Sequence, residues 1–364
     1  MLEVFNYKGP EFDINTHYLY LYSVLFIFFG ISLSPKKYHR ILMIFAFIYL
    51  WVLASFKDGV GADFEPYYYI FNHAKIGEYN SAISNIEKGF YYLNAIFNNI
   101  CDYEYFGFMI FHFIILLFVY KSIVYFKSNI SIAYALLAYL VFWYFISFNL
   151  LRISLAVAII GYAIRFLIEK KYKTYLVIVI SMYFIHRSSM LMVFPAILYI
   201  IYQKNPQIAI LASLLLFVIV NVSISVLTQF ITVDRYASYI ASDVNTSIGA
   251  NIFLKYIPLA YWLWIGKKYV SDHIWHLCFV FTLFACLVDF SGYRIEMLGR
   301  LRLYAVVPFM YYIPLFISKI QNTNTVHKYI QPVAAFVYFM LQYYLMLQSY
   351  YWGDEIMPYK SILF

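Results

Sequence analysis

Three stretches of this sequence place a basic side chain directly before a long apolar run. They are Asn149 to Ser154 before a run to about Leu167, His186 to Ser189 before a run to Tyr202, and Arg300 to Arg302 before a run to Ser318. Arginine presents a planar fork of donors that matches phosphate. Charged groups in membrane helices are rare and usually functional. The pattern therefore predicts three helix ends that converge on one anionic ligand.

Three further side chains could accept a proton in the same region. His186 lies between two apolar runs, Asp63 follows a Gly-x-Gly-Ala turn, and Glu87 borders an amphipathic stripe. Histidine exchanges protons near neutral pH, which suits a general base. Each also has a purely structural interpretation: a histidine bonded to the backbone, an Asx turn, and a helix cap. The sequence leaves open which of the three is the base.

The elements that must position these residues are membrane helices. The chain is 64% apolar and 12% charged, whereas soluble domains carry about 25% charged residues. Apolar runs recur along the whole length, which predicts an all-α polytopic membrane protein that forms a single integral membrane domain over residues 1–364. About twelve transmembrane helices are expected, at 18–33, 41–56, 106–120, 130–147, 150–167, 174–185, 188–202, 207–228, 252–266, 273–290, 302–318 and 329–349.

The charges of alternate loops predict the orientation. One set of loops carries fourteen basic and two acidic residues, so it is assigned to the cytoplasm and both termini to the outside. Six arginines then lie outside, where the positive-inside rule does not explain them: Arg152, Arg187, Arg235, Arg294, Arg300 and Arg302. Ion pairing with outer acids is the alternative. The N-termini of the three helices also point outward and favour an anion, with Asn149, Ser188 or Ser189 as expected caps.

Two outer loops are long, at 57–105 and 229–251. The first contains an apolar pattern of helical spacing, and Ser84-x-x-Glu87 within it resembles a capping box; the members of the pattern are Ile83, Ile86, Phe90, Leu93, Phe97 and Ile100. This predicts an amphipathic helix that lies on the membrane or covers a cavity. The second loop is polar, contains Asp234-Arg235-Tyr236, and is expected to act as a lid.

Other kinds of chemistry lack their motifs. We find no nucleotide-binding loop, no HExxH and no paired-aspartate motif, and His273-x-x-His276 has no suitably spaced carboxylate or cysteine. The three cysteines form no disulfide framework. We expect no metal, no cofactor and no nucleic acid, and a substrate that arrives through the membrane.

The order of five motifs resembles a known family. They are Gly61-Ala62-Asp63-x-x-x-Tyr67, Glu87-Lys88-Gly89-Phe90, Arg152-x-x-Leu155-Ala156, Phe184-x-His186-x-Ser188 and Gly299-Arg300-Leu301-x-x-Tyr304. This order is similar to the EpsG-like group of Wzy O-antigen and exopolysaccharide polymerases, over roughly residues 55–305. Ile153 stands where that pattern often has glutamine, and this departure leaves Arg152 untouched.

The resemblance implies a GT-C-like glycosyltransferase in the bacterial inner membrane, with a chain-length regulator as a candidate partner. It would join undecaprenyl-diphosphate-linked repeat units at the periplasmic face without a metal. His186 or Asp63 is then the expected base. Glu87, Tyr67 and Tyr304 would orient sugar or phosphate. The expected diphosphate ligands are Arg152, Arg300, Arg302, Arg187 and Arg235.

Three other functions use the same features. A flippase for the lipid-linked unit would place its site near the midplane between repeated halves, but no repeat is visible and the charges gather at outer helix ends. An O-antigen ligase shares the donor and the chemistry, and only the motif order favours the polymerase. A scaffold of the export machinery would leave the outer arginines unexplained.

Overall fold

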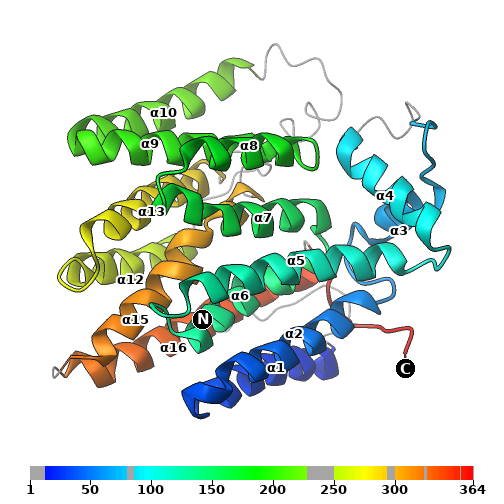
Figure 1. Ribbon diagram of the computed structural model, residues 1–364, viewed down its shortest axis with the longest axis horizontal. Coiled ribbons are helices and arrows are strands. Elements are labelled where there is room, and N and C mark those ends of the chain that lie inside the picture. The colour runs from blue at the N-terminus through cyan, green and yellow to red at the C-terminus, as the bar shows by residue number, and fades with distance from the viewer. Residues whose placement is uncertain are drawn as a thin grey trace.

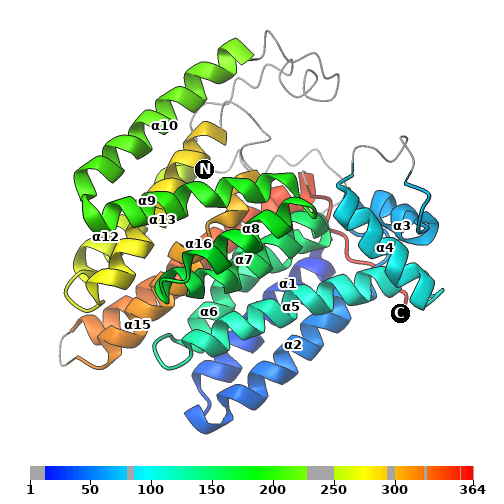
Figure 2. The same cartoon turned by 45° about the horizontal axis from the view of Figure 1, so that its top comes forward.

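The computed structural model describes residues 13–79, 86–227, 250–292, 300–323, 326–352 and 354–363. Within these ranges the chain is helical, with one isolated antiparallel bridge between Lys57 and Ser361. The helices lie side by side in a bundle, and two short helices, α3 and α4, sit at one end of it (Figures 1 and 2). The all-α prediction is confirmed.

Seven helical segments of the described ranges are long and apolar enough to cross a membrane. Four are single helices: α1 (Ile14–Ser32), α5 (Phe106–Phe126), α7 (Leu151–Ile168) and α13 (Asp272–Gly292). The others are η2 (Lys36–Tyr38) with α2 (His39–Ser55), η7 (Arg300–Tyr304) with η8 (Val307–Tyr312) and α15 (Ile313–Gln321), and α16 (His327–Trp352). The chain is therefore a polytopic membrane protein.

Further helices occupy the remaining predicted spans. They are α6 (Ile132–Tyr139) with η4 (Leu140–Tyr144) and η5 (Ile146–Phe148), α8 (Tyr172–Tyr183), α9 (Val193–Lys204), α10 (Pro206–Leu227) and α12 (Ala250–Gly266). Every predicted span thus contains a helix, while the number that cross the membrane stays a prediction. Helices α8 and α9, joined by η6 (Arg187–Met192), have 12 residues each, which is about 18 Å against a hydrocarbon core of ~30 Å.

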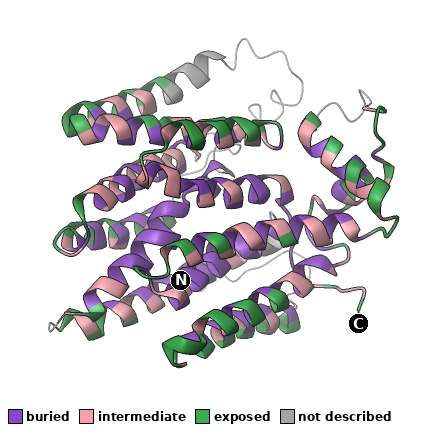
Figure 3. Cartoon of the chain, in the orientation of Figure 1, coloured by how far each residue is buried: buried purple, intermediate pink, exposed green. Residues whose placement is uncertain are grey.

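Helix α7 and the η7–α15 segment form the centre of the bundle. Buried residues concentrate on these elements and on α6, whereas the peripheral helices carry exposed faces (Figure 3). Gly161 of α7 lets the hydroxyl of Tyr311 approach its Cα closely. Many exposed side chains are large and apolar, such as Phe26 at 80% and Trp264 at 75% exposure. An apolar periphery of this kind suits a hydrocarbon solvent.

The loop between α2 and α5 folds into two helices. The predicted amphipathic helix is α4 (Lys88–Ile100), which packs the rings of Phe90 and Phe97 against Phe111 of α5, at centroid distances of 5.0 and 5.4 Å. Its stripe is shorter than predicted, because Ile100 is 68% exposed. The preceding helix α3 (Phe64–His73) is an aromatic segment without a predicted helix. Ser84 and the loop at 228–249 lie outside the described residues.

A C-terminal tail, residues 354–363, runs back along the loop that joins α2 to α3 (Figure 1). Four backbone hydrogen bonds connect the two segments: Asp58 N–H to Lys360, Gly61 N–H to Glu355, Ala62 N–H to Asp354, and Ile362 N–H to Phe56. The tail thereby supports the residues that lead into α3.

Candidate functional site

The first three predicted motifs and the histidine motif meet where α3, α4 and the start of α7 lie together. The side chains of Glu87 and Arg152 form its central contact, with 2.6 Å between Glu87 Oε2 and Arg152 Nη1. These side chains are 10% and 18% exposed. The first turn of α7 therefore presents a partly buried guanidinium that contacts a carboxylate and can also form two parallel hydrogen bonds to an anion.

Arg152 is held from two further sides. Its Nε lies 3.5 Å from the Tyr67 hydroxyl, and its guanidinium lies 5.8 Å from the Tyr67 ring and 5.9 Å from the Phe90 ring. Within the described residues, the hydrogen bonds of Arg152 to Glu87 and Tyr67 occupy one N–H of Nη1 and the N–H of Nε. An arginine carries five such donors, so the others can reach a ligand.

Glu87 connects three separate segments of the chain. Its Oε1 accepts the backbone N–H of Arg187 at 3.1 Å, and His186 Nδ1 lies 3.6 Å from the same oxygen, just beyond hydrogen-bonding distance. Burial alone would raise the pKa of Glu87, but His186, the Arg152 charge and the Arg187 N–H outweigh burial and lower that pKa to about 2. Glu87 is therefore ionised at neutral pH, which makes it an orienting anion rather than a base.

The glycine in the Glu-x-Gly-aromatic motif explains this contact. A Cβ on Gly89 would lie 2.5 Å from the carbonyl oxygen of Phe184, and the next N–H, of Phe90, donates to that carbonyl at 3.3 Å. Only glycine allows the start of α4 to approach the end of α8 this closely. Glu87 stands at the N-cap position of α4, but its side chain makes no capping bond to that helix.

Asp63 is placed by a second close approach. Gly61 adopts φ +104°, and a Cβ there would lie 2.8 Å from the carbonyl oxygen of Phe148. Beside it, the Asp63 N–H donates to Asn149 Oδ1 at 2.8 Å. The carboxylate of Asp63 makes no capping bond to α3, and its charge acts on the hydroxyl of Tyr67. Asp63 therefore borders the Arg152 cluster from α3.

The predicted helix caps are wrong. Helix α7 begins after Leu150 without a side-chain cap, and Asn149 Nδ2 instead donates to Asp354 Oδ1 at 2.9 Å. Ser189 donates to the carbonyl of Val179 at 3.3 Å. Ser188 Oγ lies 3.4 Å from the Tyr304 hydroxyl, so it connects η6 to η7. The physical reason is the same in each case: a tertiary partner competes successfully for the polar side chain.

Tyr304 is 2% exposed and lies within electrostatic range of Glu87, so η7 also reaches the cluster. The other arginines differ in position. Arg187 is exposed, and Arg302 is exposed and interacts electrostatically with Lys255. The side chain of Arg300, at the start of η7, and all of Arg235 lie outside the described residues.

A second ion pair, which the sequence did not predict, joins α12 to α13. Lys255 Nζ lies 2.5 Å from Asp289 Oδ2, and the Tyr256 hydroxyl donates to the same oxygen at 2.8 Å. The two partners lie 34 residues apart, with no local pattern to indicate the pair.

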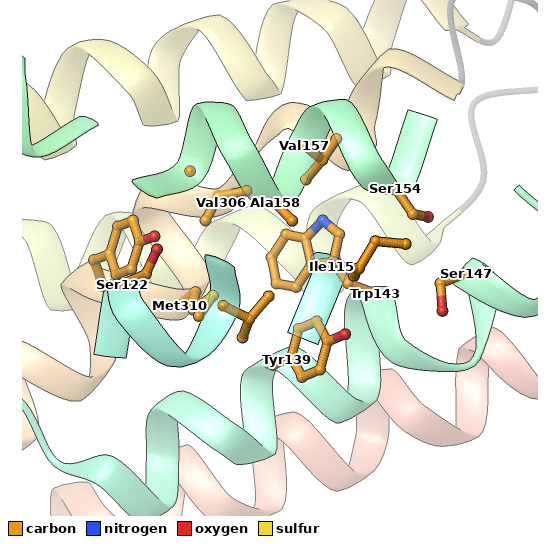
Figure 4. Close-up of a pocket in the computed structure, with 13 residues that line it drawn as sticks. Ile115, Ser122, Tyr139, Trp143, Ser147, Ser154, Val157, Ala158, Val306 and Met310 are labelled. Atoms are coloured by element: carbon orange, nitrogen blue, oxygen red, sulfur yellow. The ribbon is translucent and has the colours of Figure 1, made fainter. Parts of the chain in front are cut away.

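A small internal cavity lies behind the cluster, along the buried face of α7. Ser154, Val157 and Ala158 of α7 face Trp143 and Tyr139 across it (Figure 4). Three hydroxyls are buried on its lining, those of Ser122, Tyr139 and Tyr311. The cavity has a volume of about 20 Å³, which is room for about one water molecule, so it is too small for a sugar. The polar cluster at Arg152 remains the candidate site.

Comparison with family models matches residues 40–361 to a family described as the EpsG family. The matched range includes the whole Arg152 cluster and most of the C-terminal tail. No curated protein and no solved structure matches the chain.

Proposed function

The chain belongs to the EpsG family of membrane proteins, and we propose that it is a glycosyltransferase that polymerises lipid-linked oligosaccharide repeat units. The membership and the membrane helices are consistent with polysaccharide polymerisation in general. The finer proposal is that undecaprenyl diphosphate carries both the donor and the acceptor, and that they react at the periplasmic face of the inner membrane.

One observation supports this proposal above all others. Arg152, Glu87 and the His186–Arg187 segment come from distant parts of the chain and lie in contact at one helix end. The uncapped first turn of α7 adds backbone N–H groups to the guanidinium of Arg152. Cationic groups and a helix N-terminus together stabilise a phosphate, and a diphosphate is the leaving group of this reaction.

The proposed reaction needs few catalytic groups. The acceptor hydroxyl forms a bond to the anomeric carbon while the bond from that carbon to the diphosphate oxygen breaks. Arg152, with Arg187, Arg300, Arg302 and Arg235 as further candidates, stabilises the charge that develops on the diphosphate. His186 or Asp63 accepts the hydroxyl proton. Glu87, already ionised, holds Arg152 and His186 in register, and Tyr67 and Tyr304 border the space where the sugar would lie. No step requires a metal.

The positive-inside pattern supports the orientation. The loops at the end opposite α3 and α4 carry lysines, for example Lys36, Lys37, Lys170 and Lys171. Cytoplasmic loops are enriched in this way, so the Arg152 cluster would face the periplasm, with both termini.

Purified protein supplied with lipid-linked repeat units in detergent tests the proposal. The wild type should lengthen the units, and Arg152→Ala should abolish lengthening at matched protein levels. Arg40→Ala is the matched control, because Arg40 is exposed at the start of α2, away from the cluster. Full lengthening by Arg152→Ala would overturn the assignment of that arginine. Movement of units across vesicles without lengthening would indicate a transporter, and transfer to lipid A–core would indicate a ligase.

A further inference from the structure

The C-terminal tail contacts the candidate site through one carboxylate. Asp354 is 8% exposed and Asn149 is 3% exposed, and they meet in the hydrogen bond from Asn149 Nδ2 to Asp354 Oδ1. The same tail residue accepts the Ala62 N–H through its backbone carbonyl at 3.1 Å. Asp354 thus holds two consecutive residues before α3: Ala62 directly, and Asp63 through Asn149.

Asp354, Asn149 and Asp63 form a hydrogen-bond relay, and the chemistry of the groups determines the orientation of the Asn149 amide. An ionised carboxylate is only an acceptor, so the amide NH₂ of Asn149 must face Asp354. The amide oxygen of Asn149 then faces the other way, where it accepts the Asp63 N–H at 2.8 Å. A buried side chain with a donor partner on one side and an acceptor partner on the other has a single orientation that satisfies both.

The relay ends on residues of the proposed catalytic machinery. Asp63 directly precedes α3, which carries Tyr67 against Arg152, and Asn149 lies two residues before the start of α7, which carries Arg152. The start of α3 and the start of α7 are therefore joined by one amide, and that amide is oriented by the tail.

We propose that Asp354 is a positioning residue, and that the C-terminal tail completes the active site by fixing Asp63 and the first turn of α7 through Asn149. The activity part of this inference rests on the proposed function. The relay itself rests only on the Asp354–Asn149–Asp63 contacts.

An exchange of the two polar partners tests the relay. Asn149→Asp keeps an acceptor for the Asp63 N–H but places two carboxylates in contact, so polymerisation per folded molecule should fall roughly tenfold, the effect expected when one buried polar partner is lost. Asp354→Asn keeps an acceptor oxygen and should lose less. In the double variant Asn149→Asp/Asp354→Asn, the new amide at 354 donates to the new carboxylate at 149, and most of the lost activity should return.

The exposed neighbour Glu355 supplies the matched control, Glu355→Gln. If the tail is merely structural, the double variant should have no more polymerisation activity than Asn149→Asp alone. The absence of recovered activity in a folded double variant therefore overturns the proposal. Full activity of Asn149→Asp also overturns it. Melting temperatures of the four proteins are measured in parallel. If the wild type does not lengthen lipid-linked units, the proposed function fails and so does the catalytic part of this inference, while non-additive melting temperatures still decide whether the pair exists.

Discussion

Two ion pairs between helical segments of this protein have different surroundings. Lys255 and Asp289 join only α12 and α13, with Tyr256 donating to the same carboxylate and the ring of Phe309 5.3 Å from the ammonium group. Arg152 and Glu87 join the start of α7 to the segment before α4, and Glu87 also contacts the backbone of Arg187. The first pair is confined to two neighbouring helices. The second leaves cationic donors beside an exposed arginine.

This difference separates a structural pair from a binding pair. Removal of one partner of a buried pair strands a charge. A partly exposed guanidinium with unused donors can bind an anion without losing its carboxylate. We therefore assign stability to the Lys255–Asp289 pair and activity to the Arg152–Glu87 pair.

The largest effect is expected from Asp289→Asn. This change leaves the Lys255 ammonium buried without its carboxylate, and the loss of one partner of a buried pair costs about 3–5 kcal/mol of unfolding free energy. Thermal unfolding in detergent measures the loss, and activity per folded molecule should be unchanged. The double variant Lys255→Met/Asp289→Leu should recover much of the stability. A well-folded but inactive Asp289→Asn protein would reverse the assignment of the two pairs.

A smaller effect on free energy, but a clear one on rate, is expected from Arg152→Lys. Lysine keeps the charge but lacks the planar fork, and loss of a group that stabilises developing charge lowers a rate by about 10²-fold. Polymer length and initial rate measure it, while the melting temperature should shift much less than in Asp289→Asn. Glu87→Gln changes the partner of Arg152 instead, because glutamine keeps the shape of Glu87 and removes its charge. Equal stability losses in Arg152→Lys and Asp289→Asn would contradict the distinction.

Lys57 extends the comparison to a buried amine. Its side chain is fully buried, its Nζ lies 4.2 Å from the Phe108 ring centroid and 3.4 Å from the Val60 carbonyl, and no carboxylate of the described residues forms an ion pair with it. Burial lowers the pKa of Lys57 from 10.5 to about 7. Between these two pH values the unfolded chain binds a proton that the folded protein does not. The unfolding free energy should therefore rise with pH from about 7 toward 10.5, by at most ~1.4 kcal/mol per pH unit.

Thermal unfolding of wild type and Lys57→Met across this pH range measures the contribution of Lys57. The variant should lack the rise, and both proteins should show the same slope below pH 7. A parallel response of the two proteins throughout would show that Lys57 is not the group that titrates.

The smallest effect is expected from Arg302→Ala. Arg302 is exposed and lies within electrostatic range of Lys255, and exposed charges contribute about 0–1 kcal/mol to stability. If Arg302 serves the diphosphate, as we propose, the variant should raise the KM for the lipid-linked donor with little change in melting temperature. A change in stability alone would instead attach Arg302 to the Lys255–Asp289 pair.

Much of the fold follows from local pattern. Apolar runs place a helix in every predicted span, because a chain in hydrocarbon must satisfy its backbone groups within each segment. Residue type also identified Arg152, His186, Glu87 and Asp63 as candidates. Gly61 and Gly89 belong to two of the motifs that carry the family resemblance, and the structure explains both glycines by close backbone approaches.

The amino-acid order thus specified the helices, the membrane setting and the side chains able to do chemistry. Packing in three dimensions specified which of them meet. Asn149 looked like a cap, yet it bonds to Asp354, 205 positions away, and Glu87 pairs with Arg152 across 65 positions. Neither contact has a local signature, because hydrogen bonds and ion pairs depend on the distance between atoms in space, and that distance is set by how helices far apart in the chain pack together.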